Sequence, residues 1–143
     1  MEKKKNILIA DDDSTIRNSL AAVLQSDDYD VRLAENGRVA VRQFLQRQPD
    51  LILLDLNMPE TDGWQAFEVM ARLAPSVPVI VITARPYQAA RAAEVGIDML
   101  LEKPLDIPVL LDIIRKLLTT PEASRLARVL RAWHTNDSLS TQG

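Results

Sequence analysis

One stretch decides the fold of this chain: LILLDLNMPETDG, residues 51–63. Four consecutive apolar residues, Leu51 to Leu54, lead to a single carboxylate, Asp55, at the start of a loop bounded by Pro59 and Gly63. Such a run between turn signals is typical of a strand buried on both faces, inside a parallel sheet covered by helices. Open α/β sheets place their ligand sites at the carboxyl ends of such strands. The alternative is that Asp55 only begins a turn or caps a helix.

The composition is typical of one globular domain. The chain has 143 residues, with 47% hydrophobic and 26% charged residues, which is enough for a proper core. No apolar stretch approaches the roughly 20 residues of a membrane helix, and the run after the basic start, Ile7 to Ala10, is too short for a signal peptide. The absence of cysteine excludes disulfides and thiolate metal sites, and the net charge of -3 gives no reason to expect nucleic-acid binding. We therefore expect a cytoplasmic protein that contacts neither membrane nor nucleic acid.

The rest of the chain predicts strands and helices that alternate five times, which implies a doubly wound parallel α/β sheet. The alternation of Tyr29, Val31 and Leu33 with polar residues predicts a half-exposed strand at a sheet edge. The other expected strands cover residues 6–10, 51–55, 79–82 and 99–101, and helices are expected around residues 14–26, 37–48, 62–73, 87–95 and 105–118.

Helical spacing also predicts which side chains face the core. Val41, Phe44 and Leu45 mark the second helix, and Leu73 in the third helix is expected to face inward with Phe67 and Met70. Ser14 and Thr15 can cap the first helix, and Asp13 is expected to serve as a cap rather than as an extra metal ligand.

The C-terminal part is predicted to extend the domain. We expect a domain over residues 1–119, an amphipathic helix over 120–134 and a disordered tail over 135–143. Val109 and Ile113 widen the apolar stripe of the fifth helix beyond what one face needs. Either the extra helix covers this excess, or the chain forms a homodimer through the fourth and fifth helices or the extra helix.

Several polar residues follow carboxyl ends of predicted strands, so the fold brings them together: Asp11, Asp12 and Asp13, then Asp55, Thr83 and Lys103. Gathered carboxylates repel unless a cation neutralises them, and oxygen ligands without His or Cys suit Mg²⁺. Lys103 and Thr83 suit the oxygens of a phosphoryl group. No Ser, Cys or His is placed to accept that group, which leaves a carboxylate as nucleophile and an acyl phosphate as product.

With these residues in place, the chain resembles the receiver domains of bacterial two-component response regulators over residues 6 to about 118. The matching residues are the Asp11-Asp12 pair, the segment from Asp55 to Gly63, Thr83-Ala84 and Lys103-Pro104. The resemblance implies a flavodoxin-like sheet with strand order 2-1-3-4-5, followed here by the extra C-terminal helix.

The resemblance also implies the role of each site residue. Asp55 would be the phosphoacceptor, and Asp12, Asp55 and the backbone carbonyl of Asn57 would bind Mg²⁺ directly, with Asp11 acting through a water ligand. Thr83 and Lys103 would contact the phosphoryl oxygens, and the Lys103-Pro104 peptide is a candidate for the cis form. The donor would be a sensor histidine kinase or phosphotransfer protein, and the output would pass to a downstream protein or output domain. The chain would catalyse only its own phosphorylation and dephosphorylation.

One position departs from the family pattern. Receivers often carry Tyr or Phe where this chain has Leu100, and that aromatic changes rotamer when the threonine moves. Either the switch works through smaller shifts of the Thr83 loop and of the helix expected at residues 87–95, or its output is weakly coupled.

Other functions have less support. Asn57 stands where carboxylate-nucleophile phosphatases usually have a second acid, and no Gly-rich loop favours nucleotide binding. A degenerate receiver, which no longer takes a phosphoryl group, is favoured only by the presence of Leu100. The chain is expected to be either a stand-alone receiver or part of a longer protein.

Overall fold

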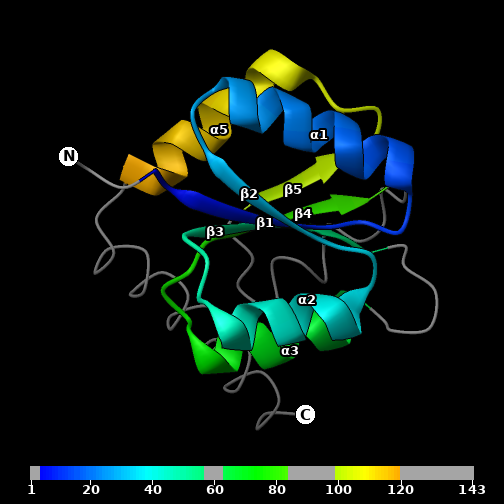
Figure 1. The fold of residues 1–143 in the computed structure, drawn as a ribbon, viewed down its shortest axis with the longest axis vertical. Helices are drawn as coiled ribbons and strands as arrows, with labels where there is room; N and C mark the ends of the chain where they lie inside the picture. Colours follow the sequence, from blue (N-terminus) through cyan, green and yellow to red (C-terminus); the bar gives the residue numbers. More distant parts are fainter. Residues whose placement is uncertain (1–3, 57–62, 84–98, 120–143) are drawn as a thin grey trace, which may run out of the picture.

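A parallel sheet of five strands forms the centre of the computed structural model, which describes residues 4–56, 63–83 and 99–119 (Figure 1). The strand order is β2-β1-β3-β4-β5, and every neighbouring pair is parallel. The predicted doubly wound sheet and its flavodoxin-like order are therefore confirmed. The strands are β1 (Asn6–Ala10), β2 (Asp30–Ala34), β3 (Leu51–Asp55), β4 (Val79–Thr83) and β5 (Met99–Glu102).

Helices cover both faces of this sheet (Figure 1). Helices α1 (Ser14–Ser26) and α5 (Ile107–Thr119) lie on one face, and α2 (Gly37–Gln46) and α3 (Gly63–Leu73) lie on the other. The helix expected at residues 87–95, the extra helix at 120–134 and the tail at 135–143 lie outside the described residues. No helix of the described ranges is both long and apolar enough to cross a membrane.

The central strands supply two separate cores because successive side chains of a strand point to opposite faces. On the α1–α5 side, Ile9, Leu53 and Ile82 pack against helix residues such as Leu24 and Leu110. The α2–α3 side receives the alternate strand residues, which are Leu8, Ala10, Ile52, Leu54, Val79 and Val81. All residues of β1, β3 and β4 are buried, whereas edge strand β2 is buried only at Ala34, as its alternating sequence predicted.

The prediction that Leu73 faces the core is wrong, and Leu45, one of the apolar residues that mark the second helix, is exposed as well. Leu45 is 66% exposed and Leu73 is 52% exposed. In α2 the buried residues are Gly37, Ala40 and Phe44, which lie on one face of the helix. Leu45 follows Phe44 and is therefore turned away from that face by about 100°. In α3 the inner face is formed by the buried residues Ala66, Phe67, Met70 and Ala71, and Leu73 falls outside this face.

Helix ends follow side chains that accept backbone hydrogen bonds. The carboxylate of Asp13 accepts from the N–H groups of Thr15 at 2.9 Å and Ile16 at 3.2 Å, so the predicted Asp13 cap is confirmed and the Ser14 or Thr15 cap is wrong. The fifth helix begins at Ile107 rather than at Leu105 because the carboxylate of Asp106 accepts from the Val109 N–H at 3.2 Å.

Candidate functional site

The site lies at the carboxyl edge of the sheet, where four strands end close to one another. β1 leads directly to Asp11, β3 ends in Asp55, β4 ends in Thr83, and Lys103 follows β5. The Lys103 N–H donates to the Thr83 carbonyl at 2.9 Å, which continues the β4–β5 ladder up to the lysine. The convergence predicted from the sequence is present because parallel strands direct all their carboxyl ends to one edge.

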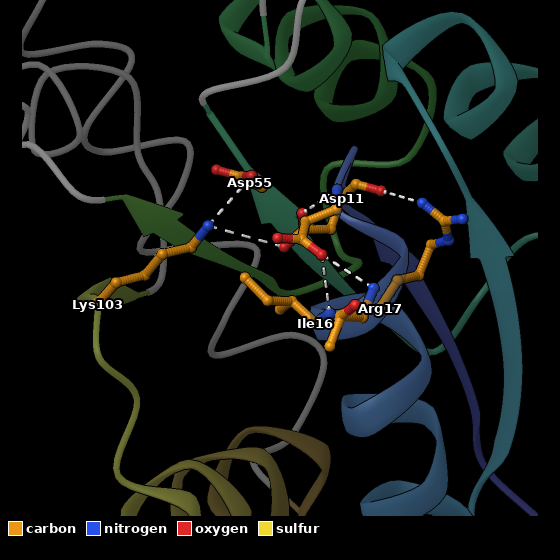
Figure 2. A network of polar contacts seen from close by, with 7 residues as sticks. Asp11, Ile16, Arg17, Asp55 and Lys103 are labelled. Atoms are coloured by element: carbon orange, nitrogen blue, oxygen red, sulfur yellow. Dashed lines mark hydrogen bonds and ion pairs between the residues drawn. The ribbon is translucent and has the colours of Figure 1, made fainter.

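Lys103 links the two buried carboxylates of the site (Figure 2). Its Nζ lies 3.3 Å from Asp55 Oδ2 and 3.8 Å from Asp11 Oδ2. The carboxylate side chains are only 1% and 2% exposed, respectively, whereas the lysine side chain is 24% exposed. One cation therefore faces two negative groups in a place where water screens little of their repulsion.

Several hydrogen bonds hold Asp11. Its N–H donates to the Ala34 carbonyl at 3.1 Å, and its Oδ1 accepts from the Asp13 N–H at 2.9 Å. Its main-chain carbonyl accepts from Arg17 Nη1 at 2.7 Å (Figure 2). The backbone and one carboxylate oxygen of Asp11 are thus fixed, while its Oδ2 is buried and accepts no hydrogen bond within the described part of the chain.

The surroundings of Asp11 favour its protonated form. Burial, as the largest effect, raises the pKa of Asp11 from 3.8 to about 6. The hydrogen bond from Asp13 lowers this pKa, the negative charge of Asp55 raises it, and the charge of Lys103 lowers it. The lysine therefore does not fully offset the cost of placing ionised Asp11 beside Asp55.

The three acids also have the arrangement of a cation site. Asp11, Asp12 and Asp55 each offer a carboxylate oxygen, and these oxygens all lie within 4.8 Å of one another. Asp12 is exposed, whereas the other two acids are buried, so the cluster opens to solvent on the Asp12 side. An all-oxygen donor set that includes a buried oxygen without a hydrogen bond fits a hard dication such as Mg²⁺. Asn57, the fourth ligand that the resemblance implied, lies outside the described residues.

The residues implied to act as a switch lie on neighbouring strands. Thr83 is fully buried at the end of β4. Leu100 is partly buried on β5, opposite Val81, and packs against the core on the α2–α3 side. The Lys103-Pro104 peptide is cis, as the resemblance implied.

A groove of about 510 Å³ opens beside Lys103, between the start of α1 and the loop that joins β5 to α5. The walls of this groove are mostly apolar. Lys103 is one of the lining residues, so the lysine lies between the groove and the acidic cluster. The lining residues are Thr15, Ile16, Ser19, Leu20, Lys103, Pro104, Leu105 and Ile107.

The sequence did not reveal the contact of Arg17 with Asp11. A signal was available, because side chains of a helix lean toward its N-terminus, so a long cation near the start of α1 can reach the preceding loop. Sequence spacing alone does not say which of several oxygens such a side chain reaches.

Comparison with known proteins shows the family to which this chain belongs. The sequence model of the response regulator receiver domain matches residues 7–115. Response regulator MprA of Mycolicibacterium vanbaalenii is 37% identical over 120 residues, which are 81% of this chain and 52% of MprA. The chain thus spans about half the length of the curated relatives it matches.

Solved structures show the same fold. A CheY-like receiver domain protein from Methanospirillum hungatei superposes with a TM-score of 0.77 at 26% identity, covering 81% of this chain and 94% of that protein. TrrA from Thermotoga maritima, solved in complex with Mg²⁺-BeF, superposes with a TM-score of 0.74 at 28% identity, covering 79% of this chain and 98% of TrrA. The chain therefore belongs to the response regulator receiver domain family, and it is a receiver domain of two-component signalling.

Proposed function

We propose that Asp55 accepts a phosphoryl group from a phosphohistidine of a sensor histidine kinase or phosphotransfer protein. The single observation that carries this proposal is the position of Asp55. Its carboxylate is buried at the end of central strand β3, lies 3.3 Å from Lys103 Nζ, and shares a cluster with Asp11 and Asp12. A carboxylate oxygen of Asp55 would attack phosphorus while the bond from phosphorus to the histidine nitrogen breaks, and the imidazole leaves.

Each remaining residue has a task in this transfer. Lys103 and the Thr83 hydroxyl would bind the oxygens of the transferred group, since both lie at the same edge of the sheet as Asp55. Asp11, Asp12, Asp55 and the Asn57 carbonyl would hold Mg²⁺, with Asp11 acting through water. When bound, Mg²⁺ neutralises the carboxylates and the incoming phosphoryl oxygens. The complex of TrrA with Mg²⁺-BeF supports this assignment.

The phosphorylated chain would act by changing a protein-binding surface, which passes the signal to a downstream protein or to an output domain. The chain would catalyse only its own phosphorylation and dephosphorylation. Because Leu100 lacks an aromatic ring and a hydroxyl, we assign the switch to small shifts of the Thr83 loop against Leu100 and the α2–α3 core. Val109 is 47% exposed on α5, which is consistent with a further helix or a second subunit covering that side.

Intact mass spectrometry tests the phosphoacceptor directly. We expect incubation with acetyl phosphate to add one phosphoryl group only when Mg²⁺ is present, and we expect Asp55→Asn to abolish the gain. Asp13→Asn is the matched control, because Asp13 caps α1 and Asn caps a helix equally well. A gain that persists in Asp55→Asn would contradict the assignment, as would no gain with either acetyl phosphate or a phosphohistidine donor.

A further inference from the structure

Arg17 contacts the acidic cluster through the backbone rather than through a carboxylate. It lies near the start of α1, and its Nη1 donates to the main-chain carbonyl of Asp11 at 2.7 Å (Figure 2). Within the described ranges, its guanidinium forms no ion pair with an acid, although the residue whose carbonyl it binds belongs to a cluster of three carboxylates.

Helix electrostatics do not explain this placement. The N-terminus of a helix carries partial positive charge, so a cation there is unfavourable. The N-cap carboxylate of Asp13 offsets part of this charge, but within the described residues Arg17 forms no ion pair with it. The position of Arg17 is therefore better explained by its hydrogen bond to the Asp11 carbonyl than by any stabilisation of α1.

The hydrogen bond of Arg17 controls the peptide that carries Asp12. The Asp11 carbonyl belongs to the same planar peptide unit as the Asp12 N–H, so fixing this oxygen fixes the plane. The Asp11 N–H, held by the Ala34 carbonyl, fixes the preceding peptide in turn. Asp12 itself is exposed, and within the described residues its carboxylate has no hydrogen bond or ion pair that would aim it. The direction of the Asp12 side chain thus depends on its backbone.

We propose that Arg17 is a positioning residue for the divalent cation: it holds the Asp11–Asp12 peptide so that the Asp12 carboxylate faces the same point as the carboxylates of Asp11 and Asp55. The inference rests on the metal site of the proposed function. It adds a residue that never touches the ion and acts only through the backbone of its ligands.

Whether replacing Arg17 weakens or tightens Mg²⁺ binding distinguishes a positioning role from a purely electrostatic one. If Arg17 were only a nearby positive charge, its removal would reduce repulsion of Mg²⁺ and tighten binding. If Arg17 holds the ligands in place, its removal loosens the site and weakens binding. A residue important only for the stability of α1 would change the unfolding temperature and leave the affinity of the folded protein unchanged.

Isothermal titration of the chain with Mg²⁺ alone provides the test. Arg17→Met keeps the apolar stem and removes the donors, Arg17→Lys keeps the charge and one donor group, and Arg42→Met removes an exposed arginine from α2 on the opposite face. We expect Arg17→Met to weaken Mg²⁺ binding by about tenfold and Arg17→Lys to restore most of the loss. We expect Arg42→Met to match the wild type, and thermal unfolding would show whether each variant is folded.

Tighter or unchanged Mg²⁺ binding in folded Arg17→Met would overturn the inference, and so would an equal loss in Arg42→Met. The titration uses no phosphoryl donor, so its result stands apart from the phosphorylation experiment. Wild-type chain that binds Mg²⁺ but takes no phosphoryl group would refute the proposed function and leave the role of Arg17 to be decided by the affinities.

Discussion

Buried polar side chains occur at both ends of the sheet, but their neighbours differ. At the carboxyl end, the carboxylates of Asp11 and Asp55 lie close together, and the Lys103 ammonium forms an ion pair with each of them. Toward the amino end, Arg32 of β2 reaches groups that are mostly neutral oxygens. We call this second group the Arg32 cluster; it consists of Asn6, Arg32, Gln43, Arg47 and Asp50.

The Arg32 cluster joins three elements through complementary partners. Arg32 Nη1 donates to the Gln43 carbonyl at 2.8 Å, its Nη2 donates to the Arg47 carbonyl, and its Nε donates to Asn6 Oδ1 at 3.4 Å. The Asn6 N–H donates to Asp50 Oδ2 at 2.7 Å. The guanidinium thus binds two carbonyls at the end of α2, where the helix itself leaves carbonyls without intrahelical partners; the Gln43 carbonyl also accepts from the Arg47 N–H.

This difference shows how one sheet supports both stability and function. The Arg32 cluster pairs most of its donors with acceptors and holds α2 to β1 and β2, although Asn6 Nδ2 is buried and makes no hydrogen bond within the described residues. The acidic site instead places like charges together, and within the described ranges Asp11 Oδ2 is buried without a hydrogen bond. Such an arrangement costs stability in the free protein and becomes favourable only when a cation binds.

The largest expected effect on stability comes from breaking the Arg32 cluster. We expect Arg32→Met to lower the free energy of unfolding by about 2 kcal/mol, because the charge-assisted hydrogen bonds to the Gln43 and Arg47 carbonyls and to Asn6 are lost. Urea unfolding measures this loss. Arg42→Met, at an exposed position of α2, is the control and should change stability by less than about 0.5 kcal/mol. Equal effects of the two substitutions would remove the distinction between the ends of the sheet.

At the carboxyl end of the sheet, we expect removal of a charged side chain to raise the free energy of unfolding rather than to lower it. Without divalent cations at pH 7, we expect Asp11→Asn to raise the free energy of unfolding by about 1 kcal/mol, after allowing for screening by water that enters from the Asp12 side. The amide keeps an acceptor for the Asp13 N–H and removes the charge that faces Asp55. Urea unfolding in EDTA measures the gain, and saturating Mg²⁺ should stabilise the wild type more than the variant.

The pH dependence checks the cause of that gain. Because the pKa of Asp11 is about 6 in the folded chain and 3.8 as its ordinary value, folded protein holds the proton more tightly. The contribution of Asp11 to stability is fully present below pH 3.8 and is lost as the pH rises toward 6 and above. The advantage of Asp11→Asn over the wild type should therefore grow across this interval. An advantage that is the same at pH 4 and pH 7 would show that Asp11 charge is not its source.

The smallest effect concerns an exposed turn near the amino end of the sheet. Asp28 ends α1 with a φ of 71°, and its carboxylate forms an exposed ion pair with Lys4 at 3.3 Å. We expect Asp28→Gly to stabilise the chain by about 0.5 kcal/mol, because glycine adopts this conformation without strain and the exposed ion pair contributes little. Asp27→Gly, at a φ of -93°, should destabilise the chain instead. Thermal unfolding compares the two, and a loss in Asp28→Gly would mean that exposed charges here matter as much as buried ones.

The sequence by itself determined the sheet and the gathering of the site residues. Apolar runs such as Leu51 to Leu54 are long enough to fill both faces of a strand, and parallel strands direct their carboxyl ends to one edge. Asp11, Asp55, Thr83 and Lys103 were therefore placed together without coordinates. The Asp13 cap was also predictable, because a cap depends only on the next few residues.

Only the tertiary structure decided how the polar groups are partnered and which apolar residues remain outside. Leu45 and Leu73 have helical spacing typical of core residues, but the actual packing of α2 and α3 leaves them exposed. Long side chains such as Arg17 and Arg32 can reach several oxygens, and the pKa of Asp11 depends on burial and on charges from distant parts of the chain. These properties arise from contacts between residues that are far apart in sequence, so local patterns do not contain them.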